Sequence, residues 1–245
     1  MSKSALSRRS LLKRTAGLSA LTVMGISGVS LPTIGFASTL TREQRDNMTP
    51  DEIISNFKQG NIRFRERKML QHDYVAQKID SKTGQYPAAV ILSCIDSRAP
   101  AEIIFDSGIA EIFNTRIAGN IQNDDILGSM EFACAVAGAK VVLVMGHTSC
   151  GAIRGAIDNA ELGNLTGLLE KIKPAIAETD YQGERTGSND DFVDAVAKTN
   201  VQMTIDNIRK HSPVLKKLEE EKKIKIVGSM YHLHNGVVDF LDAVK

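Results

Sequence analysis

Two short motifs contain side chains that could bind a metal ion. The first is Cys94-Ile95-Asp96-Ser97-Arg98, and the second is His147-Thr148-Ser149-Cys150. Two thiolates and one imidazole suit zinc, and three protein ligands leave a fourth coordination position free for water. A structural zinc site usually closes with four ligands in two short pairs, whereas Cys94 stands 53 residues before the second motif. The pattern therefore predicts a catalytic zinc site.

Apolar, β-branched segments of the kind expected for buried parallel strands precede both motifs. As a result, Cys94 and His147 follow the carboxyl ends of two strands, which is the edge where open α/β sheets bind their ligands. Four strands are expected, near residues 87–94, 111–116, 140–146 and 223–229. Because helical patterns alternate with them, the predicted fold class is α/β, with a mainly parallel sheet core flanked by helices.

Helix signals place the remaining elements. Gly146 and Gly151 flank the second motif and favour a tight turn from a strand into a helix. Thr49 followed by proline is typical of a helix start. Residues 163–212 have a helical pattern, interrupted by a polar surface loop at residues 182–189.

In these motifs the chain resembles a β-class carbonic anhydrase of the bacterial, plant-like branch. The two signatures of that family, C-x-D-x-R and H-x-x-C, are both intact, and the likeness covers most of the chain from about Thr49 onward. Three further segments resemble the family's R-x-A-G-N turn, its next helix and a late strand: residues 111–120, 125–133 and 225–231. The resemblance implies that N-terminal helices pack on a dimer partner.

The resemblance also implies an activity, which is the reversible hydration of CO2 to bicarbonate and a proton by zinc-bound hydroxide. It implies one Zn²⁺ per chain, bound by Cys94, His147 and Cys150, with Asp96 and Arg98 as the catalytic dyad beside the metal. The positions that match the family's substrate-binding residues are Gln85, Phe113, Ala118, Phe132 and Gly151. Of these, the two phenylalanines and the alanine match the apolar CO2 pocket, partly across a dimer interface. The alanine is smaller than the valine expected there, which favours a roomier pocket.

The residues themselves suggest how the dyad would work. The Asp96 carboxylate could accept a hydrogen bond from the zinc-bound hydroxide, or it could bind zinc directly and displace that hydroxide. Arg98 can hold a carboxylate through two parallel hydrogen bonds and keep it off the metal. Two thiolates also cancel the charge of the zinc ion, so its water should be less acidic than with three histidine ligands. The predicted activity therefore rises toward alkaline pH.

Two other functions use the same residues. One is hydrolysis of carbonyl sulfide or carbon disulfide on the same zinc site. The other is a non-catalytic zinc- or bicarbonate-binding protein whose aspartate caps the metal, and intact Asp96, Arg98 and Gln85 argue against it. Cys134 lies in an apolar helix pattern and is expected to be a small buried hydrophobe, while His232 and His234 are expected to be exposed.

The N-terminus resembles a twin-arginine export signal. Residues 7–13 carry the arginine pair Arg8 and Arg9. They are followed by a moderately apolar stretch and then by a small-x-small cleavage sequence at residues 35–37. We therefore expect a signal peptide over residues 1–37, a single β-carbonic anhydrase domain over residues 38–245, and export to the periplasm. The alternatives are an ordinary secretory signal that happens to carry two arginines, or an uncleaved anchor.

The charge balance bears on the partners. Residues 1–37 contribute five basic and no acidic side chains, so the mature chain has 25 basic against 29 acidic residues and a formal charge of −4. This balance does not suggest a nucleic-acid partner, and no stable membrane anchor is expected after cleavage. The expected partners are CO2 and bicarbonate and, through the resemblance, further copies of the chain in a homodimer or a multiple of dimers.

Overall fold

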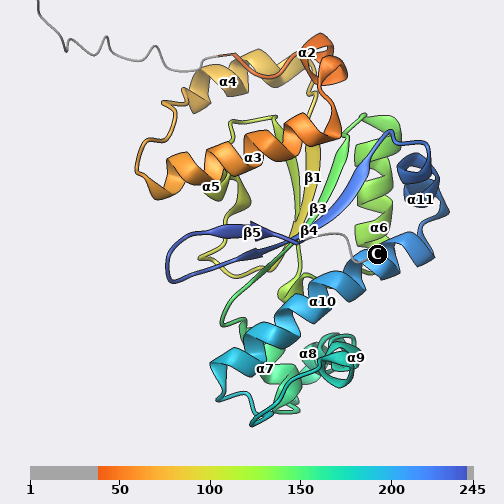
Figure 1. Ribbon diagram of the computed structural model, residues 1–245. Coiled ribbons are helices and arrows are strands. Elements are labelled where there is room, and N and C mark those ends of the chain that lie inside the picture. Colours follow the sequence, from red (N-terminus) through yellow and green to blue (C-terminus); the bar gives the residue numbers. More distant parts are fainter. Residues whose placement is uncertain (1–37, 242–245) are drawn as a thin grey trace, which may run out of the picture. The chain divides into compact units, whose positions relative to one another are not determined.

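The computed structural model describes residues 38–241, which form a five-stranded sheet in the order β2-β1-β3-β4-β5 (Figure 1). The first four strands in this order are parallel, and β5 is antiparallel to β4. The strands are β1 Ala89–Ser93, β2 Ile112–Arg116, β3 Val141–His147, β4 Lys225–Tyr231 and β5 Val238–Phe240. All four expected strands are present, which confirms the α/β prediction. Strand β5 was not expected, since its three residues are too few to show a pattern.

The strand register brings the two motifs to one edge of the sheet. Ser93, at the end of β1, pairs with Met145 of β3, which in turn pairs with Ser229 of β4. Cys94 follows β1 directly, and His147 is the last residue of β3. The neighbouring parallel strands therefore deliver these two side chains to the same carboxyl edge, as the sequence predicted.

One face of the sheet is covered by the N-terminal helices. They are α2 Arg42–Asn47, α3 Pro50–Arg65, α4 Tyr74–Asp80, the 3₁₀ turn η1 Ser81–Thr83, and the short α5 Ala101–Ile104. Helix α3 begins as predicted, because the Thr49 side chain accepts a hydrogen bond from the Glu52 backbone and the Glu52 carboxylate accepts one from the Thr49 backbone. Ile53 and Phe57 of α3 pack with Ile91 of β1 in a buried cluster on this face.

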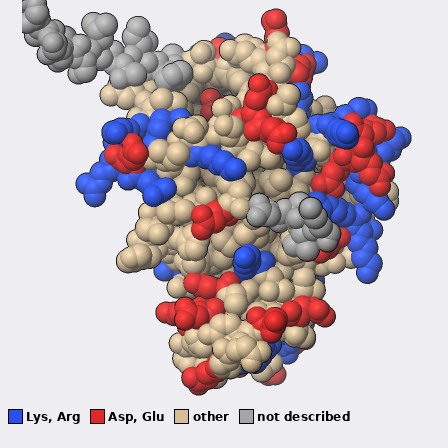
Figure 2. Space-filling view, in the orientation of Figure 1, with Lys and Arg blue, Asp and Glu red and all other residues tan. Residues whose placement is uncertain are grey.

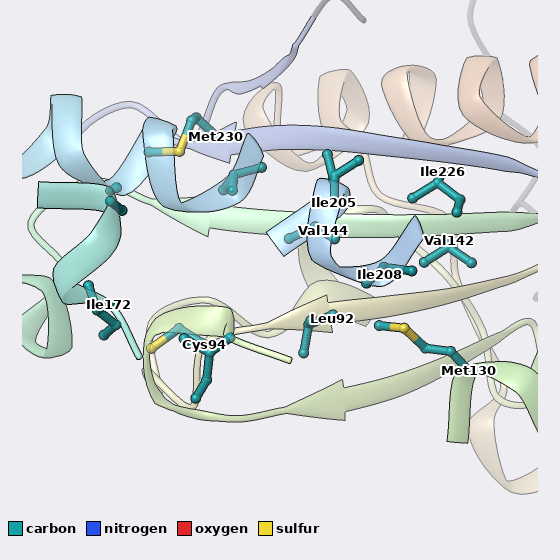
Figure 3. Packing of buried hydrophobic residues seen from close by; sticks show 14 of the residues in the cluster. Leu92, Cys94, Met130, Val142, Val144, Ile172, Ile205, Ile208, Ile226 and Met230 are labelled. Carbon is teal, nitrogen blue, oxygen red and sulfur yellow. The ribbon is translucent and has the colours of Figure 1, made fainter. Parts of the chain in front are cut away.

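The opposite face carries the larger hydrophobic cluster and the longest helix. Its elements are η2 Ala118–Asn120, α6 Asp124–Glu131, the π-helical turn η3 Phe132–Val136, α7 Gly151–Ile157, α8 Gly163–Glu170, α9 Lys173–Glu178, α10 Asp190–His211 and α11 Pro213–Glu220. Helix α10 runs across this face (Figure 1), and its Ile205 and Ile208 pack against Val142 and Val144 of β3 in the core (Figure 3). Cys94 lies at one end of this cluster (Figure 3).

The turn after β3 differs from the prediction. Gly146 lies inside β3, where an added Cβ would stand 2.6 Å from Val201 Cγ2 and 2.8 Å from Met230 Sδ. The glycine is therefore needed for the close approach of α10 and β4 rather than for a turn. The turn itself is made by Ser149, whose φ of 53° is left-handed.

Three isolated residues outside the motifs were also placed. Cys134 is 6% exposed in the larger core cluster, and burial raises the pKa of its thiol to about 12, which confirms that it is a small buried hydrophobe. His232 pairs with Asp239 across the turn before β5. The His72 side chain is only 3% exposed and contacts the fully buried Asp106 carboxylate.

On the face shown in Figure 2, acidic and basic side chains are intermixed. No helix in residues 38–241 has the length and apolar character required to cross a bilayer. The expected signal peptide, residues 1–37, lies outside the described residues.

Candidate metal centre

The three predicted zinc ligands converge in the structure. The ligand atoms of Cys94, His147 and Cys150 all lie within 4.8 Å of one another, and the two sulfur atoms are 4.0 Å apart. All three residues are buried, with exposed fractions of 4%, 1% and 1%. Cys94 comes from the end of β1, His147 from the end of β3, and Cys150 from the residue before α7. Residues that are 53 positions apart in sequence thus form one cluster.

The orientation of His147 is set by its neighbour. Its Nδ1 atom lies 2.9 Å from the Thr148 carbonyl oxygen, which can only accept, so Nδ1 carries the proton and donates. Its Nε2 atom is buried and has no hydrogen-bond partner among residues 38–241. A buried nitrogen without a partner is costly unless something else binds it. Here Nε2 faces the two thiols, where a metal ion would satisfy it.

The donor set and its spacing fit zinc. Tetrahedral zinc with Zn–S bonds of about 2.3 Å requires two sulfur ligands about 3.8 Å apart. The observed separation between the Cys94 and Cys150 sulfur atoms is 4.0 Å. A carbonyl oxygen that fixes the far nitrogen of a ligating histidine is also the usual arrangement at zinc sites.

Hydrogen bonds make Cys94 the more acidic thiol. The Cys150 thiol, with help from the nearby His147 and from the backbone N–H of Gly119, 3.4 Å from Cys94 Sγ, lowers the pKa of Cys94 to about 4 against the effect of burial. The Cys94 thiolate and burial raise the pKa of Cys150. The two sulfur atoms therefore titrate as a pair in which Cys94 loses its proton more readily than Cys150.

Asp96 and Arg98 form the predicted pair beside the ligands. Arg98 donates to Asp96 through Nε, at 3.0 Å from Oδ1, and through Nη2, at 2.7 Å from Oδ2. The Arg98 backbone N–H adds a third bond at 2.9 Å. The Arg98 side chain lowers the pKa of Asp96 to about 2, helped by this backbone bond and by His147. Asp96 Oδ2 lies 3.9 Å from His147 Nε2, so the carboxylate faces the ligand cluster.

Arg116 also supports this loop, in a role that the sequence reasoning did not assign. Its Nε donates to the Cys94 carbonyl at 2.9 Å, and its Nη2 donates to the Asp96 carbonyl at 2.5 Å. The signal available in the sequence was its place at the start of the R-x-A-G-N turn. A hydrogen bond across strands to a carbonyl gives no further pattern in the sequence.

Two of the five predicted substrate residues adjoin the ligands. Ala118 opens the η2 turn, directly before Gly119, whose N–H points at Cys94. Gly151 follows Cys150 at the start of α7, and an added Cβ there would meet nothing within 4 Å. Gly151 thus faces open space next to a ligand.

The other three lie away from the ligands of their own chain. The Phe113 and Phe132 rings pack edge to face, with centroids 6.2 Å apart, beside a surface hollow along the edge strand β2. Phe132 is 53% exposed. Gln85 is exposed in the loop before β1, at the amino end of a strand whose carboxyl end carries Cys94. Five strand residues span about 17 Å, so Gln85 is well separated from that cysteine.

Comparison with known proteins agrees with this geometry. The family model described as "Carbonic anhydrase" matches residues 89–238. The chain is 33% identical to "Carbonic anhydrase 2" of Mycobacterium tuberculosis H37Rv over 199 residues, covering 78% of this chain and 92% of that protein. It is 32% identical to a carbonic anhydrase of Pseudomonas aeruginosa PAO1 over 170 residues, covering 65% of this chain and 76% of the relative.

Solved structures share the fold. The β-carbonic anhydrase CafA of Aspergillus fumigatus superposes with a TM-score of 0.63 at 24% identity, covering 80% of this chain and 91% of that one. A chain from the tetrameric β-carbonic anhydrases of Sordaria macrospora gives a TM-score of 0.59 at 23% identity, covering 66% of this chain and 83% of that one.

Proposed function

This chain belongs to the β class of the carbonic anhydrase family, and we propose that Asp96 and Arg98 orient the reactants at its zinc site. The enzyme catalyses the zinc-dependent, reversible hydration of CO2 to bicarbonate. The observation that carries the site is the buried cluster of two thiols and one imidazole whose Nε2 has no partner among the described residues.

Zinc, when bound by Cys94, His147 and Cys150, supplies the Lewis acidity that makes water a better nucleophile near neutral pH. The protein must keep that reactant in the right orientation. With its pKa at about 2, Asp96 stays ionised, so its carboxylate accepts hydrogen bonds from a reactant and does not donate them. The two parallel bonds from Arg98 hold the carboxylate in place and restrain it from moving onto the metal.

The substrate residues divide into two groups. We propose that Ala118 and Gly151, which adjoin the ligands, line the substrate position within the same chain. Gln85, Phe113 and Phe132 lie elsewhere on the chain, and we propose that they serve the site of a second subunit. The exposed Phe132 and the hollow along the edge strand β2 support a neighbour at this position.

Assembly and location complete the proposal. Enzymes of this class form dimers or tetramers, and the related structures from Sordaria macrospora are tetrameric. We propose a homodimer, or a multiple of dimers, built along the β2 edge. We also propose that residues 1–37 are a twin-arginine signal, removed on export to the periplasm, and that residues 38–245 form the mature domain.

Stopped-flow CO2 hydration tests the function. We expect rapid hydration by the zinc-loaded mature chain, and its loss in Cys94→Ala. Cys134→Ala is the matched control, because this buried cysteine lies in the core outside the ligand cluster and its loss should leave hydration intact. A zinc-loaded wild-type chain that hydrates no CO2 would refute the proposal and favour a sulfur-containing substrate such as carbonyl sulfide.

A further inference from the structure

Helix α10 passes behind the loops that form the zinc centre. Ala197 and Val201 pack close to Gly146, one residue before the ligand His147. The same helix also directs two polar side chains, Asp194 and Asn200, at backbone atoms next to ligands. Six residues on a helix span about 9 Å, so these two side chains reach different loops.

Asp194 holds the His147–Cys150 loop. Its Oδ1 atom accepts a hydrogen bond of 2.7 Å from the backbone N–H of Ser149, which stands between the two ligands. Ser149 has a φ of 53°, a left-handed conformation that L-residues other than glycine seldom adopt. A strained residue persists only when its surroundings hold it there. The Asp194 carboxylate is the side-chain partner that the structure gives to this N–H.

Asn200 holds the turn that contacts the third ligand. Its Nδ2 donates to the Gly119 carbonyl at 2.7 Å, and its exposed fraction is only 3%. The Gly119 N–H in turn points at Cys94 Sγ, 3.4 Å away. Gly119 has a φ of 69°, and Thr204 of α10 donates to the next carbonyl, of Asn120, at 3.3 Å. Asn200 thus acts on Cys94 through a single residue, Gly119, whose carbonyl it binds and whose N–H faces the sulfur.

We propose that Asp194 and Asn200 are positioning residues that preform the zinc site. Asp194 fixes the spacing of His147 and Cys150 by holding Ser149, and Asn200 fixes the N–H group that faces the Cys94 thiolate. Both side chains act through backbone atoms and touch neither the metal position nor the substrate. The inference rests on the proposed zinc site, but it concerns binding of the metal rather than turnover.

Zinc affinity, measured by competition with a chelator, tests this role. We expect Asp194→Ala and Asn200→Ala each to bind zinc about 10–100-fold more weakly, the usual effect of losing a group that orients metal ligands. Asp191→Ala and Lys198→Ala, on the exposed side of the same helix, are matched controls and should keep the wild-type affinity. Asp194→Asn keeps an oxygen acceptor for Ser149 and should restore most of the binding.

A second readout separates positioning from general stability. In the cobalt(II)-substituted protein, the thiolate-to-cobalt charge-transfer band should shift in Asn200→Ala, because the N–H facing Cys94 is displaced. If an alanine variant does not fold, a variant of similar side-chain size takes its place. Asp194→Leu removes the acceptor for the Ser149 N–H, and Asn200→Asp removes the donor to the Gly119 carbonyl.

Unchanged zinc affinity in a folded variant of either residue would overturn the role of that residue. A wild-type protein that binds no zinc would instead refute the proposed site.

Discussion

Single side chains at the metal centre must lose protons before they bind zinc. Cys94, with a pKa of about 4, is already a thiolate at neutral pH. Cys150 is not, because the Cys94 thiolate and burial raise its pKa. For His147, burial lowers the pKa, but the Cys94 thiolate, the Thr148 carbonyl and Asp96 outweigh it and the net shift is upward. Zinc therefore competes with at least the proton on Cys150.

The first prediction is that zinc affinity rises with pH. Because the pKa of the Cys150 thiol is raised above its usual value, this thiol is protonated at neutral pH. Zinc must displace that proton, and a lower proton concentration favours zinc. We expect an increase of about tenfold per pH unit for each displaced proton. Chelator competition between about pH 6 and 8, within the range in which imidazoles and perturbed thiols titrate, measures this slope. A pH-independent affinity would show that both sulfur atoms are already deprotonated.

The second prediction concerns Asp96→Asn. The amide has no negative charge and only one acceptor oxygen, so the paired bonds from Arg98 are lost. We expect kcat/KM for CO2 hydration to fall by about 10–100-fold, as for other groups that orient a metal site, with zinc still bound. Asp191→Asn, on the exposed side of α10, is the control. An Asp96→Asn enzyme with wild-type kcat/KM would contradict the orienting role.

Between elements, close packing of α10 on the sheet fixes where the ligands stand. At Gly146 the helix comes so near to β3 that a methyl group would overlap Val201 and Met230. Gly167 offers the opposite case, since an added Cβ in the middle of α8 would meet nothing within 4 Å. Replacing Gly146 therefore tests the tight packing of α10 on the sheet, whereas replacing Gly167 tests only the backbone flexibility of a glycine in a helix.

The third prediction uses this pair. Gly146→Ala should destabilise the fold by about 1–3 kcal/mol, the usual cost of overpacking a core. Gly167→Ala should stabilise it by about 0.5–1 kcal/mol, because alanine loses less backbone entropy in a helix. Urea denaturation of both variants gives the two free energies of unfolding. Equal and small effects would mean that α10 can move away from β3.

Helices and strands could be predicted from the sequence wherever the pattern that defines them is local. The capping box at Thr49 and the four apolar strands were predictable because neighbouring residues define them. The convergence of Cys94 on the His147 loop was predictable through the parallel sheet. The contacts of Asp194 and Arg116 were not, since each joins a side chain to a distant backbone atom. Such bonds depend on the final packing and leave no periodicity in the sequence.

At the scale of the whole molecule, we expect the enzyme to need a second subunit to complete its substrate pocket. The turn η3 begins and ends with an exposed apolar side chain, Phe132 at 53% and Val136 at 73% exposure, and Phe132 packs on Phe113 of the edge strand β2. Isolated exposed apolar residues are common, but neighbouring ones at an open sheet edge favour an interface. The Gln85 loop also lies far from the ligands of its own chain.

The fourth prediction is that Val136→Lys weakens the proposed dimer. A charged side chain in an apolar interface is costly to bury, so the variant should shift toward monomer in sedimentation velocity. Leu162→Lys is the matched control, because Leu162 is 71% exposed between α7 and α8, away from β2. A Val136→Lys chain that remains as associated as the control would place the interface elsewhere.

The fifth prediction concerns export. Replacing Arg8 and Arg9 by lysine keeps both positive charges, so an ordinary secretory signal should still work, whereas a twin-arginine signal should fail. Cell fractionation of bacteria that express the full chain shows the difference. Retention of the double-lysine chain in the cytoplasm is expected, and its normal appearance in the periplasm would contradict the twin-arginine assignment.

Zinc K-edge X-ray absorption on the loaded mature chain tests the metal centre most directly. Binding by Cys94, His147 and Cys150 predicts two sulfur ligands at about 2.3 Å and two nitrogen or oxygen ligands at about 2.0 Å. Cys134→Ala should leave this spectrum unchanged, and Cys150→Ala should remove one sulfur. A spectrum with three sulfur ligands, or with none, would contradict the proposed centre.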